Sequence, residues 1–191
     1  MARAITIFLL LSLAGCAKPM DIASVTQIKP NTGSSSIDVY EPHRRRGQKG
    51  IPDYAGDQFL EVRTYTYKQD EGRVEIGNAS CEISTAHYSA KMTTPARVRV
   101  PLYRGSSSIL GVVCEKEGYR KKHGSVAPID IVRRQRFAHS TQGGLIGVAV
   151  VAVIDAASDN TKNEWRYPVA RITLDPVSKK PKQRARTNPI N

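Results

Sequence analysis

The sequence contains few residues of the kinds that build catalytic or metal sites. Its 4 histidines, His43, His87, His123 and His139, have no metal-ligand spacing, and none lies at short range from a cysteine. No glycine-rich loop has the phosphate-binding pattern. Ser140, beside His139, lacks the acid, base and oxyanion groups of a nucleophilic site. We therefore predict no cofactor, no metal and no enzymatic activity.

Long apolar runs and acidic residues are also scarce. The most apolar segment, residues 145–154, is too short for a transmembrane helix. The 191 residues include 29 lysines and arginines against 17 acidic residues, a formal net charge of +12. This excess favours partners that carry anionic groups. The length suits one domain with a modest core.

Residues 1–15 have the features of an export signal. Arg3 supplies a positive n-region, and residues 5–13 form a short apolar h-region. The segment ends in Leu-Ala-Gly-Cys, residues 13–16, which resembles the lipobox of bacterial lipoproteins. The resemblance implies cleavage before Cys16 by signal peptidase II and acylation of that cysteine, and several acyl chains anchor a protein stably. The alternative is an ordinary secretory signal with a cysteine there by chance.

Ala17 bears on the predicted location. It stands where an aspartate marks inner-membrane retention in enterobacteria. We therefore expect the periplasmic face of the outer membrane, with the cell surface as an alternative. A disulfide persists in such an oxidising compartment.

The two remaining cysteines, Cys81 and Cys114, lie in segments that alternate like strands. Alternation places each of them on an apolar face; the residues that share these faces are Ala79, Ile83, Leu110 and Val112. We therefore predict a disulfide between Cys81 and Cys114, with buried thiols as the alternative.

Further strands are predicted on both sides of Cys81. The segments are residues 59–67, residues 74–76 after the Asp-Glu-Gly turn at 70–72, and residues 97–100. Pro95 and Pro101 bracket the last segment, as suits strand ends.

Residues 79–119 resemble PEGA-type and carboxypeptidase-regulatory-like β-sandwich domains. The resemblance rests on Ala79-x-Cys81-x-Ile83, Thr94-Pro95-x-x-Val98-x-Val100 and Leu110-x-Val112-x-Cys114-x-Lys116-x-Gly118-Tyr119. A group of uncharacterised proteobacterial lipoproteins is more similar still, because a Gly-Gly-hydrophobic-Gly segment (here 143–147) and a Tyr-Pro strand (here 167–174) follow. The chain departs from the sandwich families in two respects: cysteines bridge its strands, and a long basic loop is inserted at residues 120–142.

The predicted fold is mainly β, a small antiparallel β-sandwich with one short glycine-rich helix. Its parts are a signal peptide (1–15), a lipidated, disordered linker (16–57), the sandwich (58–175) and a disordered basic tail (176–191). Proline, glycine and serine without sustained periodicity indicate the linker. The helix is placed within residues 143–157, where a buried strand is the alternative.

Two basic segments are candidate polyanion-binding sites. Their residues are Arg44, Arg45, Arg46, Lys179, Lys180, Lys182, Arg184 and Arg186. The alternatives are a solvated charge run and a solubilising tail.

These features predict a lipid-anchored envelope protein whose non-catalytic sandwich binds peptidoglycan or another glycan in a structural role. Expected partners are the membrane, peptidoglycan, lipopolysaccharide or another envelope protein. The alternative is an interaction subunit of a secretion or surface-appendage complex, docking through the basic loop and residues 143–154. Nucleic acid is not expected, because the basic residues lack interleaved aromatics.

Overall fold

The computed structural model describes residues 18–22, 24–105, 107–140 and 163–177. Its longest element is β3 (Tyr54–Lys68), in which alternate residues from Leu60 to Thr66 are buried. Successive side chains of a strand point to opposite faces. The even-numbered residues of this stretch therefore enter the core, while odd-numbered neighbours such as Phe59 and Arg63 face outward.

Sheet A is built around β3. Its order is β1 (Ser24–Gln27), β7 (Ala96–Tyr103), β3 and β12 (Ala170–Thr173), and β4 (Gly72–Ile76) also pairs with β3. The β3–β7 and β3–β4 pairs are antiparallel, whereas β1–β7 and β12–β3 are parallel. Pro101 was predicted to end a strand and instead lies inside β7. It is tolerated because it lies beyond the residues of β7 that pair with β1.

Sheet B is antiparallel throughout. Its order is β2 (Lys29–Pro30), β6 (Tyr88–Thr93), β5 (Ser80–Ser84), β8 (Leu110–Glu115) and β9 (Lys122–Val126). Cys81 lies directly opposite Cys114 in the β5–β8 register, and the two form the predicted disulfide, with their Cα atoms 4.1 Å apart.

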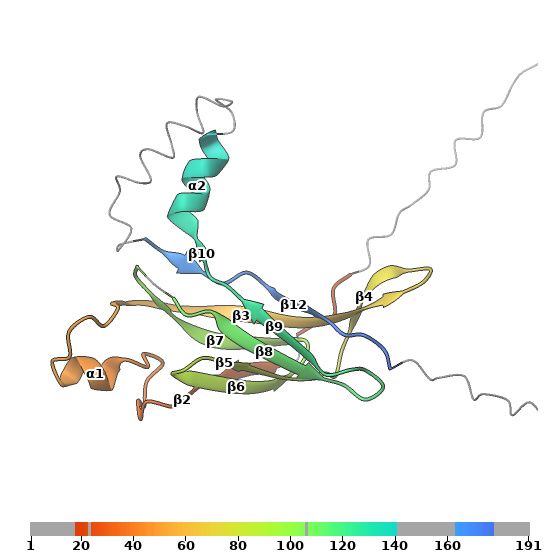
Figure 1. The fold of residues 1–191 in the computed structure, drawn as a ribbon, viewed down its shortest axis with the longest axis horizontal. Coiled ribbons are helices and arrows are strands. Elements are labelled where there is room, and N and C mark those ends of the chain that lie inside the picture. Colours follow the sequence, from red (N-terminus) through yellow and green to blue (C-terminus); the bar gives the residue numbers. More distant parts are fainter. Residues whose placement is uncertain (1–17, 23, 106, 141–162, 178–191) are drawn as a thin grey trace, which may run out of the picture.

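The two sheets enclose one apolar core, which confirms the predicted mainly β sandwich (Figure 1). Its buried residues include Leu60, Val62, Val98, Ile83, Leu110 and Val112. At one edge, β9 approaches β12 through Gly124, where an added Cβ would lie 3.1 Å from Ile172 Cδ1. The missing side chain therefore permits the close approach of the two sheets.

The structure corrects the linker predicted at residues 16–57. Only Ile28 separates β1, which belongs to sheet A, from β2, which belongs to sheet B. The chain therefore changes sheets at this buried residue and closes the edge opposite β9 and β12. A half-exposed strand of 4 residues produces no sustained apolar periodicity, which explains why the pattern missed it.

The remainder of that predicted linker packs on one end of the sandwich (Figure 1). It contains α1 (Glu41–Arg45) and the fully buried Val39. The Val39 N–H donates to Tyr103 Oη at 3.0 Å, and the Tyr40 ring lies 5.0 Å from the Tyr103 ring. Prolines and glycines therefore shape a packed segment here.

The basic loop predicted at residues 120–142 is also largely regular. It contains β9, β10 (Ile129–Asp130) and α2 (Ile131–Ser140), and β10 pairs with β11 (Trp165–Arg166). Asp130 caps α2, because its Oδ1 accepts a hydrogen bond from the Arg133 N–H at 2.9 Å. The helix extends away from the sandwich (Figure 1). The glycine-rich helix predicted within residues 143–157 lies outside the described residues.

Candidate functional site

Residues 18–22 lie on the outer face of sheet A. The Met20 N–H donates to Glu75 Oε2 at 3.0 Å, and Arg63 Nη1 donates to the Met20 carbonyl at 3.0 Å. Arg63 also donates to Glu75 Oε1 at 2.7 Å. The Met20 side chain covers Gly77, where an added Cβ would lie 2.8 Å from Met20 Cε. These contacts join the start of the described chain to β3 and to the end of β4.

The predicted lipidation residue, Cys16, lies outside the described residues, four positions before Met20. An extended chain spans at most about 3.6 Å per residue, so Cys16 lies within about 14 Å of the Met20 contacts.

Paired charges cross this face. Arg99 Nε and Nη2 donate to the two carboxylate oxygens of Asp57 at 2.7 and 2.8 Å, and Arg97 Nη2 donates to Glu61 Oε1 at 3.0 Å. Hydrogen bonds from Arg99 hold the pKa of Asp57 below its ordinary value, and those from Arg97 do the same for Glu61. Both carboxylates are therefore held ionised and compensated.

Large apolar side chains are exposed between these charges. Val25, Phe59 and Tyr67 are 64%, 53% and 66% exposed. In the strand registers, Val25 lies beside Arg97 and Phe59 beside Arg99. We call this mixed region the sheet A surface; it consists of Met20, Val25, Phe59, Arg63, Tyr67, Arg97 and Arg99. The sequence showed the alternation of its strands but carried no signal for the Met20 contacts.

The three arginines predicted as a polyanion site have different roles. Arg44 forms an ion pair with Asp38, and its Nη1 donates to the Pro52 carbonyl at 2.7 Å, so it fastens the α1 segment. Arg45 forms an ion pair with Glu41 but stays largely exposed. Arg46 is exposed and has no ion pair among the described residues.

Arg45 and Arg46 are the members of this set that an anion can reach. Both line a recess of about 280 Å³ together with Ser34, Ser35 and Glu41, whose carboxylate is already paired with Arg45. The Ser34 hydroxyl donates to the Asp38 carbonyl at 2.9 Å, so the donors left for a carboxylate or phosphate are the two guanidinium groups and the Ser35 hydroxyl.

The predicted tail site, Lys179, Lys180, Lys182, Arg184 and Arg186, lies outside the described residues. The chain enters it from Val177, whose N–H donates to the Gly118 carbonyl at 2.9 Å between β8 and β9. Arg44, by contrast, holds the segment just before β3, at the other end of the sandwich (Figure 1). The structure therefore does not bring the attachment of the tail and the α1 arginines together.

A cluster of tyrosines occupies the α1 end. Burial raises the pKa of Tyr88 and Tyr103 above the ordinary value and that of Tyr167 to about 12. The protonated Tyr103 hydroxyl donates to Asp38 Oδ1 at 3.1 Å, and the Tyr167 hydroxyl donates to the Ser108 carbonyl at 2.6 Å. The Tyr103 and Tyr167 side chains thus fasten loops to the end of the sandwich.

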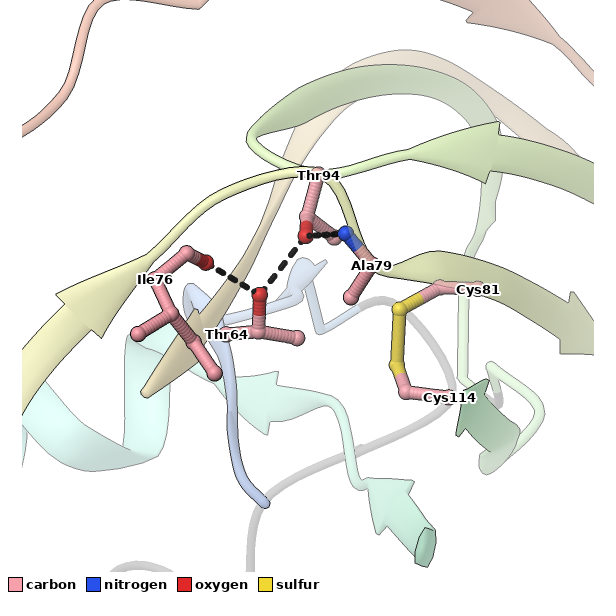
Figure 2. The surroundings of a disulfide bond; sticks show 6 residues. All are labelled: Thr64, Ile76, Ala79, Cys81, Thr94 and Cys114. Carbon is pink, nitrogen blue, oxygen red and sulfur yellow. Dashed lines mark hydrogen bonds between the residues drawn. A yellow bond between two sulfur atoms is a disulfide. The ribbon is translucent and has the colours of Figure 1, made fainter. Parts of the chain in front are cut away.

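The disulfide lies beside a buried threonine pair (Figure 2). Thr64 Oγ1 donates to the Ile76 carbonyl at 2.6 Å, and the Ala79 N–H donates to Thr94 Oγ1 at 3.3 Å. Because the Thr64 proton is used, the Thr94 hydroxyl is the donor in the Thr64–Thr94 hydrogen bond of 2.6 Å. This chain of hydrogen bonds joins the two crossings between the sheets, after β4 and before β7.

Within the described part of the chain, no group of three or more His, Cys, Asp or Glu side chains could hold a metal ion. In the same residues, no helix is long and apolar enough to cross a bilayer.

No known protein family, curated protein or solved structure matches this chain. The resemblance to PEGA-type domains and to lipoproteins stays a prediction.

Proposed function

We propose that the protein is a lipid-anchored, non-catalytic module of the bacterial outer membrane that binds anionic envelope polymer in a structural role. The observation that carries the proposal is the contact of Met20, four residues after Cys16, with sheet A. Residues 18–22 already contact β3 and β4, so the long spacer expected from the sequence is not available. The sandwich is held beside the membrane, so the favoured binding partners are anionic groups near the membrane surface.

The polymer-binding part rests on the exposed cations of the α1 end. Arg45 and Arg46 share one recess, and the chain carries a formal net charge of +12. Lipopolysaccharide phosphates and peptidoglycan carboxylates present the complementary chemistry. At physiological ionic strength such attraction acts over a Debye length of about 8 Å, so it concentrates a protein at a surface.

The anchor is tested with Cys16→Ser. The natural chain should incorporate palmitate and fractionate with outer membranes, and the variant should lose both properties. Unchanged labelling and fractionation in the variant would refute the anchor.

Polymer binding is tested by sedimentation with peptidoglycan and, separately, with lipopolysaccharide as salt is raised. We expect Arg45→Gln/Arg46→Gln to bind more weakly and with a shallower salt dependence. Lys91→Gln/Lys122→Gln removes the same charge from sheet B and should bind as the natural chain does. Equal retention of all three proteins, or capture of one dominant protein from crosslinked envelopes in place of polymer, would contradict the proposal and favour the interaction subunit.

A further inference from the structure

Residues 18–22 contact the outer face of sheet A beside Arg63 and Glu75. Arg63, which holds the Met20 carbonyl, lies on β3 four residues from both Phe59 and Tyr67. At about 3.3 Å per residue, each of these exposed rings lies roughly 13 Å from Arg63 along the strand. The reach of about 14 Å from Met20 to Cys16 is comparable. A lipid attached at Cys16 is therefore tethered on the side of the sandwich that exposes both rings.

We propose that the outer face of sheet A lies against the lipid bilayer, with Val25, Phe59 and Tyr67 at its interface. The inference rests on the proposed anchor at Cys16. It names the surface that faces the membrane, which the anchor alone does not decide.

The side chains of this face suit a lipid headgroup region. Aromatic rings settle at membrane–water interfaces, and arginines extend charged heads toward phosphates from apolar stems. Asp57 and Glu61 are compensated by Arg99 and Arg97, so they do not present unopposed negative charge to the lipid.

Two further arginines add positive charge to the same face. Arg73 lies over the Tyr65 ring, 4.2 Å from its centroid, and Arg171 is exposed on β12. Neither has a carboxylate partner among the described residues, so both are available to anionic lipids.

The outer face of sheet B has a different character. Its outward residues on β5 and β6 are Ser80, Glu82, Ser84, Ser89, Lys91 and Thr93. None is a large apolar side chain, and the one outward apolar residue of β8, Val113, is half-buried. The exposed rings and the Met20 contacts thus share one side of the sandwich, and this coincidence favours the bilayer as the occupant of that side.

The test places tryptophan on each face of the lipidated full chain in vesicles of phosphatidylethanolamine and phosphatidylglycerol. Phe59→Trp reports on sheet A, and Val113→Trp, outward on β8, is the matched control on sheet B. Lipids brominated along their acyl chains quench nearby indoles, and the native Trp165 signal is subtracted with the natural chain. We expect quenching of Phe59→Trp to exceed that of Val113→Trp at least about twofold. The indole at position 59 lies at the membrane interface, near the brominated chains, whereas the indole at position 113 faces away from the bilayer.

Flotation of the natural chain with the vesicles separates the two proposals. A chain that does not float overturns both the anchor and the orientation. A chain that floats but shows equal or reversed quenching overturns the orientation alone. A blue-shifted Phe59→Trp emission without quenching shows that protein, such as a second copy, covers the face, and also overturns the orientation. Tyr67→Trp repeats the measurement at the other ring, so misfolding of one variant does not remove the test.

Discussion

The outer faces of the two sheets differ although their inner faces are alike. Both sheets turn alternate apolar residues into one shared core, as Val62 and Val112 do. Outside, sheet B carries small polar residues such as Ser80, whereas sheet A exposes Phe59 and Tyr67. The core accounts for the inward residues of both sheets. Several exposed apolar residues on one outer face, as on sheet A, mark that face as a candidate contact surface.

The sheets are also held together differently. Two neighbouring strands of sheet B are joined by the Cys81–Cys114 disulfide, while sheet A depends on β3, which pairs with three other strands. Removal of the disulfide, of the polar contact between the sheets, or of a charge on the sheet A surface should therefore lower the stability of the protein by different amounts.

The largest effect is expected from Cys81→Ala/Cys114→Ala. The cysteines are 33 residues apart, so loss of the crosslink should lower the free energy of unfolding by about 4 kcal/mol on the chain-entropy account. We expect Tm to fall by roughly 10 °C in a thermal melt. Ser80→Ala, on the outer face of the same strand, is the control and should leave Tm unchanged. Free thiols in the native protein, or an unaltered melt of the double variant, would contradict the prediction.

The buried threonine pair should have the next effect. Thr94→Val keeps the shape of the side chain but leaves the Ala79 N–H without its acceptor and removes the hydrogen bond that Thr64 Oγ1 accepts. Burial of unsatisfied polar groups costs about 1–3 kcal/mol, measurable by urea denaturation. Thr93→Val, one residue earlier and exposed, should be nearly neutral. Equal denaturation midpoints for the two variants would show that the hydrogen bonds do not join the sheets energetically.

Much of this fold could be predicted because the core imposes alternation on the strands that cross it. Cys81, Ile83, Val112 and Cys114 displayed that alternation, and from it the mainly β fold and the disulfide followed. The same pattern could not show the partners of each strand. The parallel pairing of β1 with β7 depends on contacts between residues about seventy positions apart, which leave no local trace.

The candidate site was less predictable for a related reason. Arg44, Arg45 and Arg46 are adjacent and identical in type, yet Arg44 fastens its segment through Asp38 and Pro52 while Arg46 faces solvent. The path of the backbone through this packed segment decides which of the three guanidinium groups turns inward, and the sequence does not show that path. The linker was misjudged similarly, because proline and glycine occur both in flexible chains and in packed turns.

A smaller effect is expected on the sheet A surface from Asp57→Asn. The pKa of Asp57 is lowered in the folded protein by hydrogen bonds from Arg99, so its stabilising contribution is present above the unfolded pKa of about 3.9. That contribution is lost as the pH falls through the lower folded pKa. At pH 7 we expect the variant to melt about 2 °C lower, since partly exposed pairs are weak.

The pH dependence separates this pair from a general charge effect. The difference in Tm between the natural chain and Asp57→Asn should shrink below pH ~4. Asp70→Asn, in the turn before β4, makes the same change in charge away from Arg99 and should show no such difference. A constant difference across pH would mean that the carboxylate charge is not the cause.

The smallest effect on stability, and the most local one, is expected from Gly77→Ala. The added Cβ would lie 2.8 Å from Met20 Cε, the free end of a flexible side chain, so Met20 can move aside and Tm should change by less than about 1 °C. The movement should nevertheless loosen residues 18–22 from sheet A. Hydrogen exchange at the Met20 amide, which donates to Glu75, should therefore become faster while exchange in the core strands is unaltered. In the Met20→Ala background the clash is absent, so Gly77→Ala should have no further effect on that amide. If Gly77→Ala leaves the Met20 amide fully protected in the natural background, the segment does not depend on this contact, and the attachment of the anchor to sheet A must rest on Arg63 and Glu75.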